Sequence, residues 1–161
     1  MASTNATTVD SASDVVEILE KDHRLVKDLF AKLSDEDDKG TMRSIVEELK
    51  AALTVHNALE ENVVYPAIRV LAGRKGDADT LYHQQDEAEV ALWEIDGILK
   101  GSLDGDGLKG RVEALQKAVL AHIRKEEETE FPHLRGALGA DEMSDLTRAA
   151  REFRQKFRFQ G

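Results

Sequence analysis

The sequence contains no cysteine and only two prolines among its 161 residues. Without cysteine the chain forms no disulfide, holds no iron–sulfur cluster and binds no zinc through thiolates. Aromatic residues are scarce as well, at 5%, and no stretch shows the alternation of apolar and polar residues that is typical of a strand. These absences leave a helical protein whose chemistry must come from other side chains.

The chain also lacks an excess of positive charge and a long apolar run. Its formal net charge is −10 at pH 7, which argues against nucleic acid or an anionic membrane as the partner, because both require positive surface. No apolar run approaches the roughly 20 residues of a membrane span, and the polar N-terminus has no signal-peptide core. We expect a cytoplasmic protein without a membrane partner, present as a monomer, with a dimer as the alternative.

The composition of 41% hydrophobic and 34% charged residues suits one soluble helical domain. Residues 1–13 are small and polar, and we expect them to form a disordered tail ahead of a domain over residues 14–161. In this domain apolar residues recur in steps of three and four, which is the period of a helix with one buried face. The pattern predicts helices over residues 14–33, 41–72, 77–100 and 108–135, and a fifth helix over 141–157.

The predicted fold is all-α, because short turns join four amphipathic helices of similar length. We expect an up-down-up-down four-helix bundle with the short fifth helix laid alongside. Ser13 is the expected cap of the first helix. Pro66 is expected to kink the second helix beyond its inward polar residues, because proline removes a backbone hydrogen bond and crowds the carbonyl four residues back.

One pattern, His-x-x-x-Glu-Glu-x-x-x-aromatic-Pro, occurs twice, from His56 to Pro66 and from His122 to Pro132. Residues four apart lie on one helix face about one turn apart, so each copy directs an imidazole and a carboxylate to the same place. The third helix carries a further His-x-x-x-Glu pair, and the first helix carries one histidine on its apolar stripe. Seven polar side chains thus fall on faces predicted to point inward: His23, His56, Glu60, His83, Glu87, His122 and Glu126.

A bound metal explains these seven residues better than a structural role does. One histidine on an apolar stripe is more often a hydrogen-bonded core residue, and an isolated His–Glu pair is often a surface interaction worth a few tenths of a kcal/mol. Three buried carboxylates, however, would cost several kcal/mol each without compensation. Seven ligands are too many for one tetrahedral zinc and divide over two octahedral ions, and imidazole with carboxylate suits iron.

The set of motifs resembles the hemerythrin-like (HHE cation-binding) family over about residues 14–158. The resemblance implies two iron ions with an oxo or hydroxo bridge and carboxylate bridges. It places His23 and His56 on one iron and His83, Glu87 and His122 on the other, bridged by Glu60 and a carboxylate of the fourth helix. Glu126 is favoured for that last position by its parallel with Glu60, and Glu127 is the alternative. No catalytic residue is expected beyond the metal ligands.

The third helix departs from the oxygen carriers of this family, which have His-x-x-x-His where this chain has His83 and Glu87. An additional carboxylate stabilises the ferric state, so we expect net reaction with hydrogen peroxide, O2 or NO rather than reversible O2 carriage. Catalase-like removal of peroxide is the favoured activity. The alternative is a module that binds or senses O2 or iron without turnover.

Overall fold

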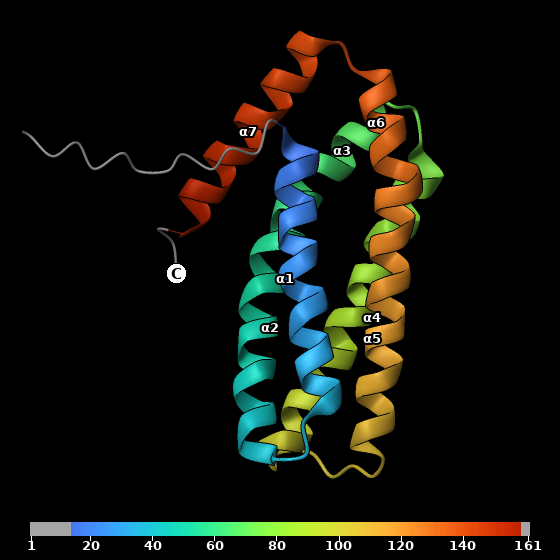
Figure 1. Ribbon diagram of the computed structural model, residues 1–161. Helices are drawn as coiled ribbons and strands as arrows, with labels where there is room; N and C mark the ends of the chain where they lie inside the picture. Colours follow the sequence, from blue (N-terminus) through green and yellow to red (C-terminus); the bar gives the residue numbers. More distant parts are fainter. Residues whose placement is uncertain (1–13, 159–161) are drawn as a thin grey trace, which may run out of the picture.

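The structure is a computed structural model, and it describes residues 14–158 (Figure 1). The predicted tail at residues 1–13 and the position of Ser13 lie outside this range. Within it the chain is all-helical without any strand, as predicted. The elements in order are α1 (Val15–Asp35), α2 (Lys39–Leu59), the π-helix η1 (Glu60–Val64), α3 (Tyr65–Val70), α4 (Lys75–Leu99), α5 (Leu108–Lys125), the π-helix η2 (Glu126–Glu130), α6 (Phe131–Ala137) and α7 (Ala140–Arg158).

Two aspartates cap the N-termini of the first two long helices. The Asp14 carboxylate accepts a hydrogen bond of 3.0 Å from the backbone N–H of Glu17 and caps α1. Asp38 caps α2 in the same way, accepting from the backbone N–H of Thr41 at 2.8 Å. Each carboxylate satisfies a backbone donor that the first helical turn leaves unpaired and lies at the positive end of the helix dipole.

Four long helices, α1, α2, α4 and α5, run side by side along the length of the molecule (Figure 1). Each has two of the others as neighbours, because α1 contacts α2 and α5 while α4 also contacts α2 and α5. Helix α7 lies across one end of this bundle and contacts α1, α2 and η1. None of the helices described is long and apolar enough to cross a membrane.

The apolar core is divided into two clusters along the bundle. One contains residues such as Phe30, Leu49 and Ile95, and the other contains residues such as Leu19 and Phe131. Along α1, the apolar residues of the first half belong to one cluster and those of the second half to the other. The continuous helical path from α5 through η2 to α6 is divided along its length in the same way. The intervening layer is polar, and the regular period of the helices places inward-facing histidines and glutamates there.

Each of the two π-helices ends two positions before a proline, Pro66 or Pro132. The backbone N–H of Tyr65 bonds to the carbonyl of Glu60, five residues back, and Phe131 bonds to Glu126 in the same way. Proline lacks the donor of a regular α-helical bond and crowds the carbonyl four residues back, and a π-turn widens the helix at that point. The expected distortion near Pro66 is present, but it begins at Glu60 rather than beyond it.

Candidate metal centre

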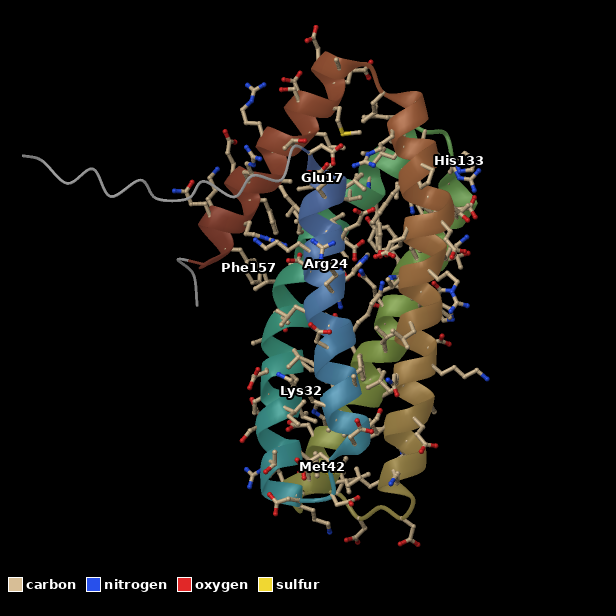
Figure 2. The ribbon with its side chains drawn as sticks, viewed as in Figure 1. Glu17, Arg24, Lys32, Met42, His133 and Phe157 are labelled. Carbon is tan, nitrogen blue, oxygen red and sulfur yellow. The ribbon has the colours of Figure 1, made fainter. Side chains whose placement is uncertain are left out.

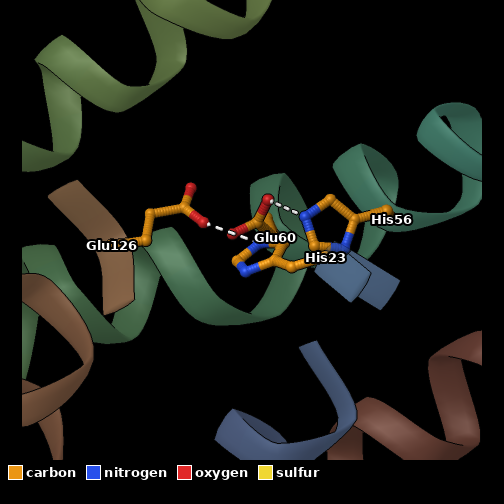
Figure 3. A group of neighbouring side chains, drawn as sticks. All are labelled: His23, His56, Glu60 and Glu126. Carbon is orange, nitrogen blue, oxygen red and sulfur yellow. Dashed lines mark ion pairs between the residues drawn. The ribbon is translucent and has the colours of Figure 1, made fainter. Parts of the chain in front are cut away.

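Four buried side chains from four helical elements meet in the polar layer (Figure 3). His23 comes from α1, His56 from α2, Glu60 from the start of η1 and Glu126 from the start of η2. One nitrogen or oxygen of each lies within 4.8 Å of the others, and all four residues are buried. Imidazole nitrogens and carboxylate oxygens at this spacing can surround one cation.

The donor atoms pair with one another across the cluster. The Nε2 atom of His56 lies 2.6 Å from Glu60 Oε1, and Nε2 of His23 lies 3.1 Å from Glu126 Oε2. The Nε2 atom of His122, on α5, lies 2.6 Å from the other oxygen of Glu126. Glu126 therefore has an imidazole at each carboxylate oxygen, and His122 is a fifth donor at the edge of the cluster.

The opposite nitrogen of each imidazole has its own hydrogen-bond acceptor. Nδ1 of His56 lies 3.1 Å from Asp22 Oδ2, Nδ1 of His23 lies 2.9 Å from Glu127 Oε1, and Nδ1 of His122 lies 2.8 Å from Gln84 Oε1. Each acceptor favours a proton on Nδ1 and leaves the Nε2 lone pair directed into the cluster, the arrangement found around metal-binding histidines.

The same contacts distinguish the two candidate carboxylates at the start of η2. Glu126 is fully buried inside the cluster, whereas Glu127 is partly exposed and lies behind His23. Glu127 also pairs with Lys27, whose Nζ is 3.3 Å from its Oε2 atom. The carboxylate four residues after His122, and not the one five residues after it, faces the other donors.

Two residues that the sequence analysis did not assign complete the polar layer. The Tyr65 hydroxyl donates to Glu126 Oε1 at 2.6 Å and lies 3.1 Å from Nε2 of His122. The Gln85 amide of α4 donates to the Tyr65 hydroxyl at 2.8 Å and to Glu60 Oε1 at 3.1 Å. The i to i+5 bond of the π-turn widens the helix, and Tyr65 and Glu60 both accept a hydrogen bond from Gln85 on the same side of it.

The electrostatics of the cluster demand positive charge. Burial opposes ionisation of His56, yet the Glu60 and Asp22 carboxylates raise its pKa to about 10. Burial and the nearby charge of Glu126 raise the pKa of Glu60. Burial also opposes ionisation of Glu126, but His122 and His23 hold its pKa well below the ordinary value. Two carboxylates this close are stable only with protons or a cation between them.

Several polar atoms that point into the cluster lack a hydrogen bond, as expected at a cation site. Within the part of the chain that the structure describes, Glu60 Oε2 and Gln85 Oε1 are buried without a hydrogen-bond partner, and His23 Nε2 and Glu126 Oε2, although 3.1 Å apart, do not form a hydrogen bond either. Buried polar atoms are normally paired, and an unpaired one points to a bound ion, water or ligand. Three of these four atoms are nitrogen or carboxylate donors that suit a transition metal, so the residues fit a metal ion.

The structure does not bring His83 and Glu87 into the cluster, and the expectation that they point inward is wrong. They form an exposed ion pair on the outer face of α4, with side chains 73% and 67% exposed. The face of α4 that points inward is therefore a different one from the predicted face. The observed buried face includes Ala78, Leu81, Gln85, Leu92, Ile95 and Leu99. The remaining five predicted ligands, His23, His56, Glu60, His122 and Glu126, do lie together.

The fifth histidine of the chain lies outside the cluster. His133, on α6, is exposed, and its Nδ1 atom is 2.6 Å from the carbonyl oxygen of Thr129. Figure 2 shows it at the outer side of the molecule. This backbone contact accounts for His133 without a metal.

A cavity of about 310 Å³ adjoins the cluster. Its wall contains His23, His56, His122 and Gln85, while much of the remainder is apolar. The apolar contribution comes from all four long helices, through Val26, Leu53, Ala88, Leu92, Trp93, Ala118, Val119 and Ile123. A small molecule in this cavity would contact the donor residues and an apolar wall at the same time.

Comparison with known proteins agrees with this site. The sequence profile of the family described as "Hemerythrin: Hemerythrin HHE cation binding domain" matches residues 14–134. A protein named "DNA nickase" from Nostoc sp. is 31% identical over 129 residues, which cover 80% of this chain and 36% of that relative. The matched family region contains all five clustered donors and ends before α7. By this match, the chain belongs to the hemerythrin HHE cation binding domain family.

Proposed function

We propose that the protein is a non-haem iron protein that reacts with hydrogen peroxide, O2 or NO, on an up-down-up-down four-helix bundle. The observation that carries the proposal is the convergence of five imidazole and carboxylate donors with unpaired inward atoms. Iron suits this mixture of nitrogen and oxygen donors and, when bound, supplies the change of oxidation state that these reactions need. The side chains of the bundle hold the ion, orient the ligand and limit the access of water.

The number of ions is part of the proposal. A pair of irons was expected from seven ligands, but two of those, His83 and Glu87, are on the surface. We propose that the first ion binds tightly among His23, His56, Glu60 and Glu126. The second ion would rely on His122 and the shared Glu126. It should bind more weakly because α4 presents an amide, Gln85, instead of an imidazole or carboxylate.

Hydrogen peroxide is the favoured small molecule because of a hydrogen-bond acceptor in the wall of the cavity. Glu87 is exposed, so it adds no negative charge to the metal centre and does not favour peroxide. Gln85 Oε1, however, is a buried acceptor without a partner in residues 14–158, and Gln85 lines the cavity. Hydrogen peroxide can donate a hydrogen bond to this oxygen, whereas O2 and NO have no donor. The amide would hold peroxide beside the metal donors.

Nicking of DNA, the activity in the name of the Nostoc relative, is not proposed for this chain. The chain spans little more than a third of that relative's length. Both clustered carboxylates are fully buried, so a phosphodiester backbone cannot reach an ion held between them. The net charge of −10 also opposes approach of a polyanion.

Anaerobic loading of the metal-free protein with iron(II), followed by addition of peroxide, tests the proposal. We expect bound iron, a near-ultraviolet charge-transfer band after oxidation, and evolution of O2 from peroxide. His56→Ala should reduce all three. The matched control is His83→Ala, which removes the histidine of an equally spaced pair on the outer face and should change none of them.

Two results would separate the alternatives. Spectral changes with O2 or NO in the absence of peroxide consumption would favour the binding or sensing module. Failure of the wild-type protein to bind iron, while it binds zinc with a fixed stoichiometry, would overturn the proposal.

A further inference from the structure

Helix α7 lies beyond the region matched by the family profile, yet it reaches the metal centre indirectly. The profile ends at residue 134, and α7 begins at Ala140. Its residue Arg154 contacts Asp22 of α1, and Asp22 in turn contacts His56 of α2. Three helices are thus connected through one carboxylate directly behind a proposed metal ligand.

The contact between Arg154 and Asp22 uses both ends of both groups. Arg154 Nη1 donates to Asp22 Oδ1 at 3.1 Å, and Nη2 donates to Oδ2. Such a two-point contact fixes the plane of the carboxylate as well as its position. The two side chains are only 18% and 24% exposed, so water competes less strongly for them than it does at an open surface.

Asp22 transmits this restraint to the imidazole. Its Oδ2 atom accepts from Nδ1 of His56 at 3.1 Å, while Nε2 of the same ring points to Glu60 at 2.6 Å. An acceptor at Nδ1 sets both the tautomer and the orientation of a metal-binding ring, and loss of such an acceptor typically weakens metal binding 10- to 100-fold. Without the guanidinium, Asp22 would be free to rotate away from this position.

The other two imidazoles are held differently. The acceptor behind His23 is Glu127, which pairs with Lys27 of α1, and the acceptor behind His122 is Gln84 of α4. Both arrangements use residues within the matched family region. Asp22, in contrast, forms an ion pair with a residue of α7, Arg154.

We propose that Arg154 is a positioning residue of the metal centre, through which docking of α7 fixes Asp22 and thereby His56. The inference rests on the proposed function in one respect, that His56 binds the metal. It adds that a helix outside the family region controls how tightly the metal is held. Undocking of α7 would loosen the metal without altering any ligand.

A purely structural role for Arg154 gives different expectations, and α7 offers a matched control. The Thr147 hydroxyl accepts a buried hydrogen bond of 3.0 Å from the backbone N–H of Val15, and this contact docks α7 at a point remote from Asp22. Thr147→Val removes this contact but leaves the Arg154–Asp22 pair in place, so it should lower the melting temperature of the metal-free and metal-loaded proteins alike. It should leave the intrinsic metal affinity within about twofold of the wild-type value.

The experiment uses the full chain and measures iron(II) affinity by competition with a chelator, with cobalt(II) as a spectroscopic probe. We expect Arg154→Ala to weaken binding about tenfold or more and to alter the cobalt spectrum. Arg154→Lys should recover part of the affinity, because it restores the charge but not the two-point contact. In an Asp22→Asn background, Arg154→Ala should add little, since the residue it acts through is already changed.

The results that would overturn the inference are specific. Arg154→Ala could match Thr147→Val, with an unchanged metal affinity and cobalt spectrum, or its effect could add fully to that of Asp22→Asn. Either result would make Arg154 an ordinary docking residue. Both differ from failure of the proposed function, in which the wild-type protein itself would bind no iron. If Arg154→Ala does not fold, Arg154→Lys, alone and in the Asp22→Asn background, decides the question by the same measurements.

Discussion

The hydroxyl of Tyr65 donates a hydrogen bond of 2.6 Å to Glu126, although the two residues are 61 positions apart. Tyr65 belongs to the first copy of the repeated motif and Glu126 to the second. The first π-helix brings Tyr65 into line with Glu60, and the second begins at Glu126 itself. The corresponding aromatic residue of the second copy, Phe131, has no hydroxyl and stacks near His23 at a ring distance of 5.9 Å. The repeat is therefore symmetric in backbone and asymmetric in chemistry.

Tyr65→Phe should destabilise the metal-free protein by about 1–3 kcal/mol, because it deprives the buried Glu126 carboxylate and Gln85 amide of a partner. Burial and the charges of Glu60 and Glu126 raise the pKa of Tyr65 well above its ordinary value, so the hydroxyl is a proton donor at neutral pH. Urea unfolding measures the difference. Tyr82→Phe is the control, because its partly buried hydroxyl donates 2.9 Å to the backbone oxygen of Glu61 and lies outside the cluster. Equal losses in the two variants would contradict the special position of Tyr65.

Pro66→Ala should separate stability from metal binding. Alanine restores a backbone donor and removes the crowding of the carbonyl four residues back, so the helix can relax towards regular α-helical bonding. That relaxation would rotate Tyr65 relative to Glu60. We expect equal or higher stability of the metal-free protein together with weaker iron binding, measured by thermal unfolding and chelator competition. Lower stability with unchanged iron affinity would show that the π-turn does not depend on the proline.

The sequence predicted the helices and most of the cluster because their signals are local. His23, His56 and Glu126 interrupt regular apolar stripes, and all three are buried. On α4 two faces compete, and the His-x-x-x-Glu pattern favours the face of His83, which the structure places outside. The correct face runs through Ala78, Leu81, Gln85, Ala88, Leu92, Ile95 and Leu99 in alternating steps of three and four, the regularity of a packed seam.

Two features of the site were not predictable from the periodicity. Pro66 indicated a distortion, but hydrophobic spacing does not tell whether a helix widens by one residue or bends, and that choice decides where Tyr65 points. The pairing of Arg154 with Asp22 spans 132 positions and depends on how α7 docks. Neither residue breaks an apolar stripe, so no local pattern marks their contact.

Asp96 should contribute a pH-dependent part of the stability, away from the metal centre. Its Oδ2 atom lies 3.0 Å from Lys50 Nζ and 2.8 Å from Lys100 Nζ. Burial opposes its ionisation, but the two lysines lower its pKa below the ordinary value. A lowered pKa stabilises the fold above the unfolded-state pKa, near 3.9, and this contribution is lost as the pH falls through the folded-state pKa.

Comparison of the wild-type protein with Asp96→Asn tests this prediction. The wild type should be the more stable at about pH 6, and the difference should shrink as the pH approaches about 3, because protonation then removes the charge that the substitution removes. Urea unfolding of the metal-free proteins gives the free energies. Asp104→Asn, at an exposed position in the turn before α5, is the control and should show little difference at either pH. A constant Asp96→Asn difference across the range would contradict the linkage.

Gln85→His should strengthen binding of a second iron ion. Gln85 is the buried polar residue through which α4 reaches both Glu60 and Tyr65, so a histidine there would place an imidazole where the helix now presents an amide. Imidazole is a far better ligand for iron than a neutral amide. Iron titration of wild-type protein should give one tight and one weak equivalent, and Gln85→His should tighten the weak one. The matched substitution Glu87→His, on the exposed face of the same helix, should leave both equivalents unchanged.

Gln85→Leu, which removes the amide without adding a ligand, separates the gain of imidazole from the loss of the hydrogen bonds. If Glu87→His tightened the second equivalent while Gln85→His did not, α4 would have to present its other face to the metal. The exposed ion pair of His83 and Glu87 would then belong to the site after all.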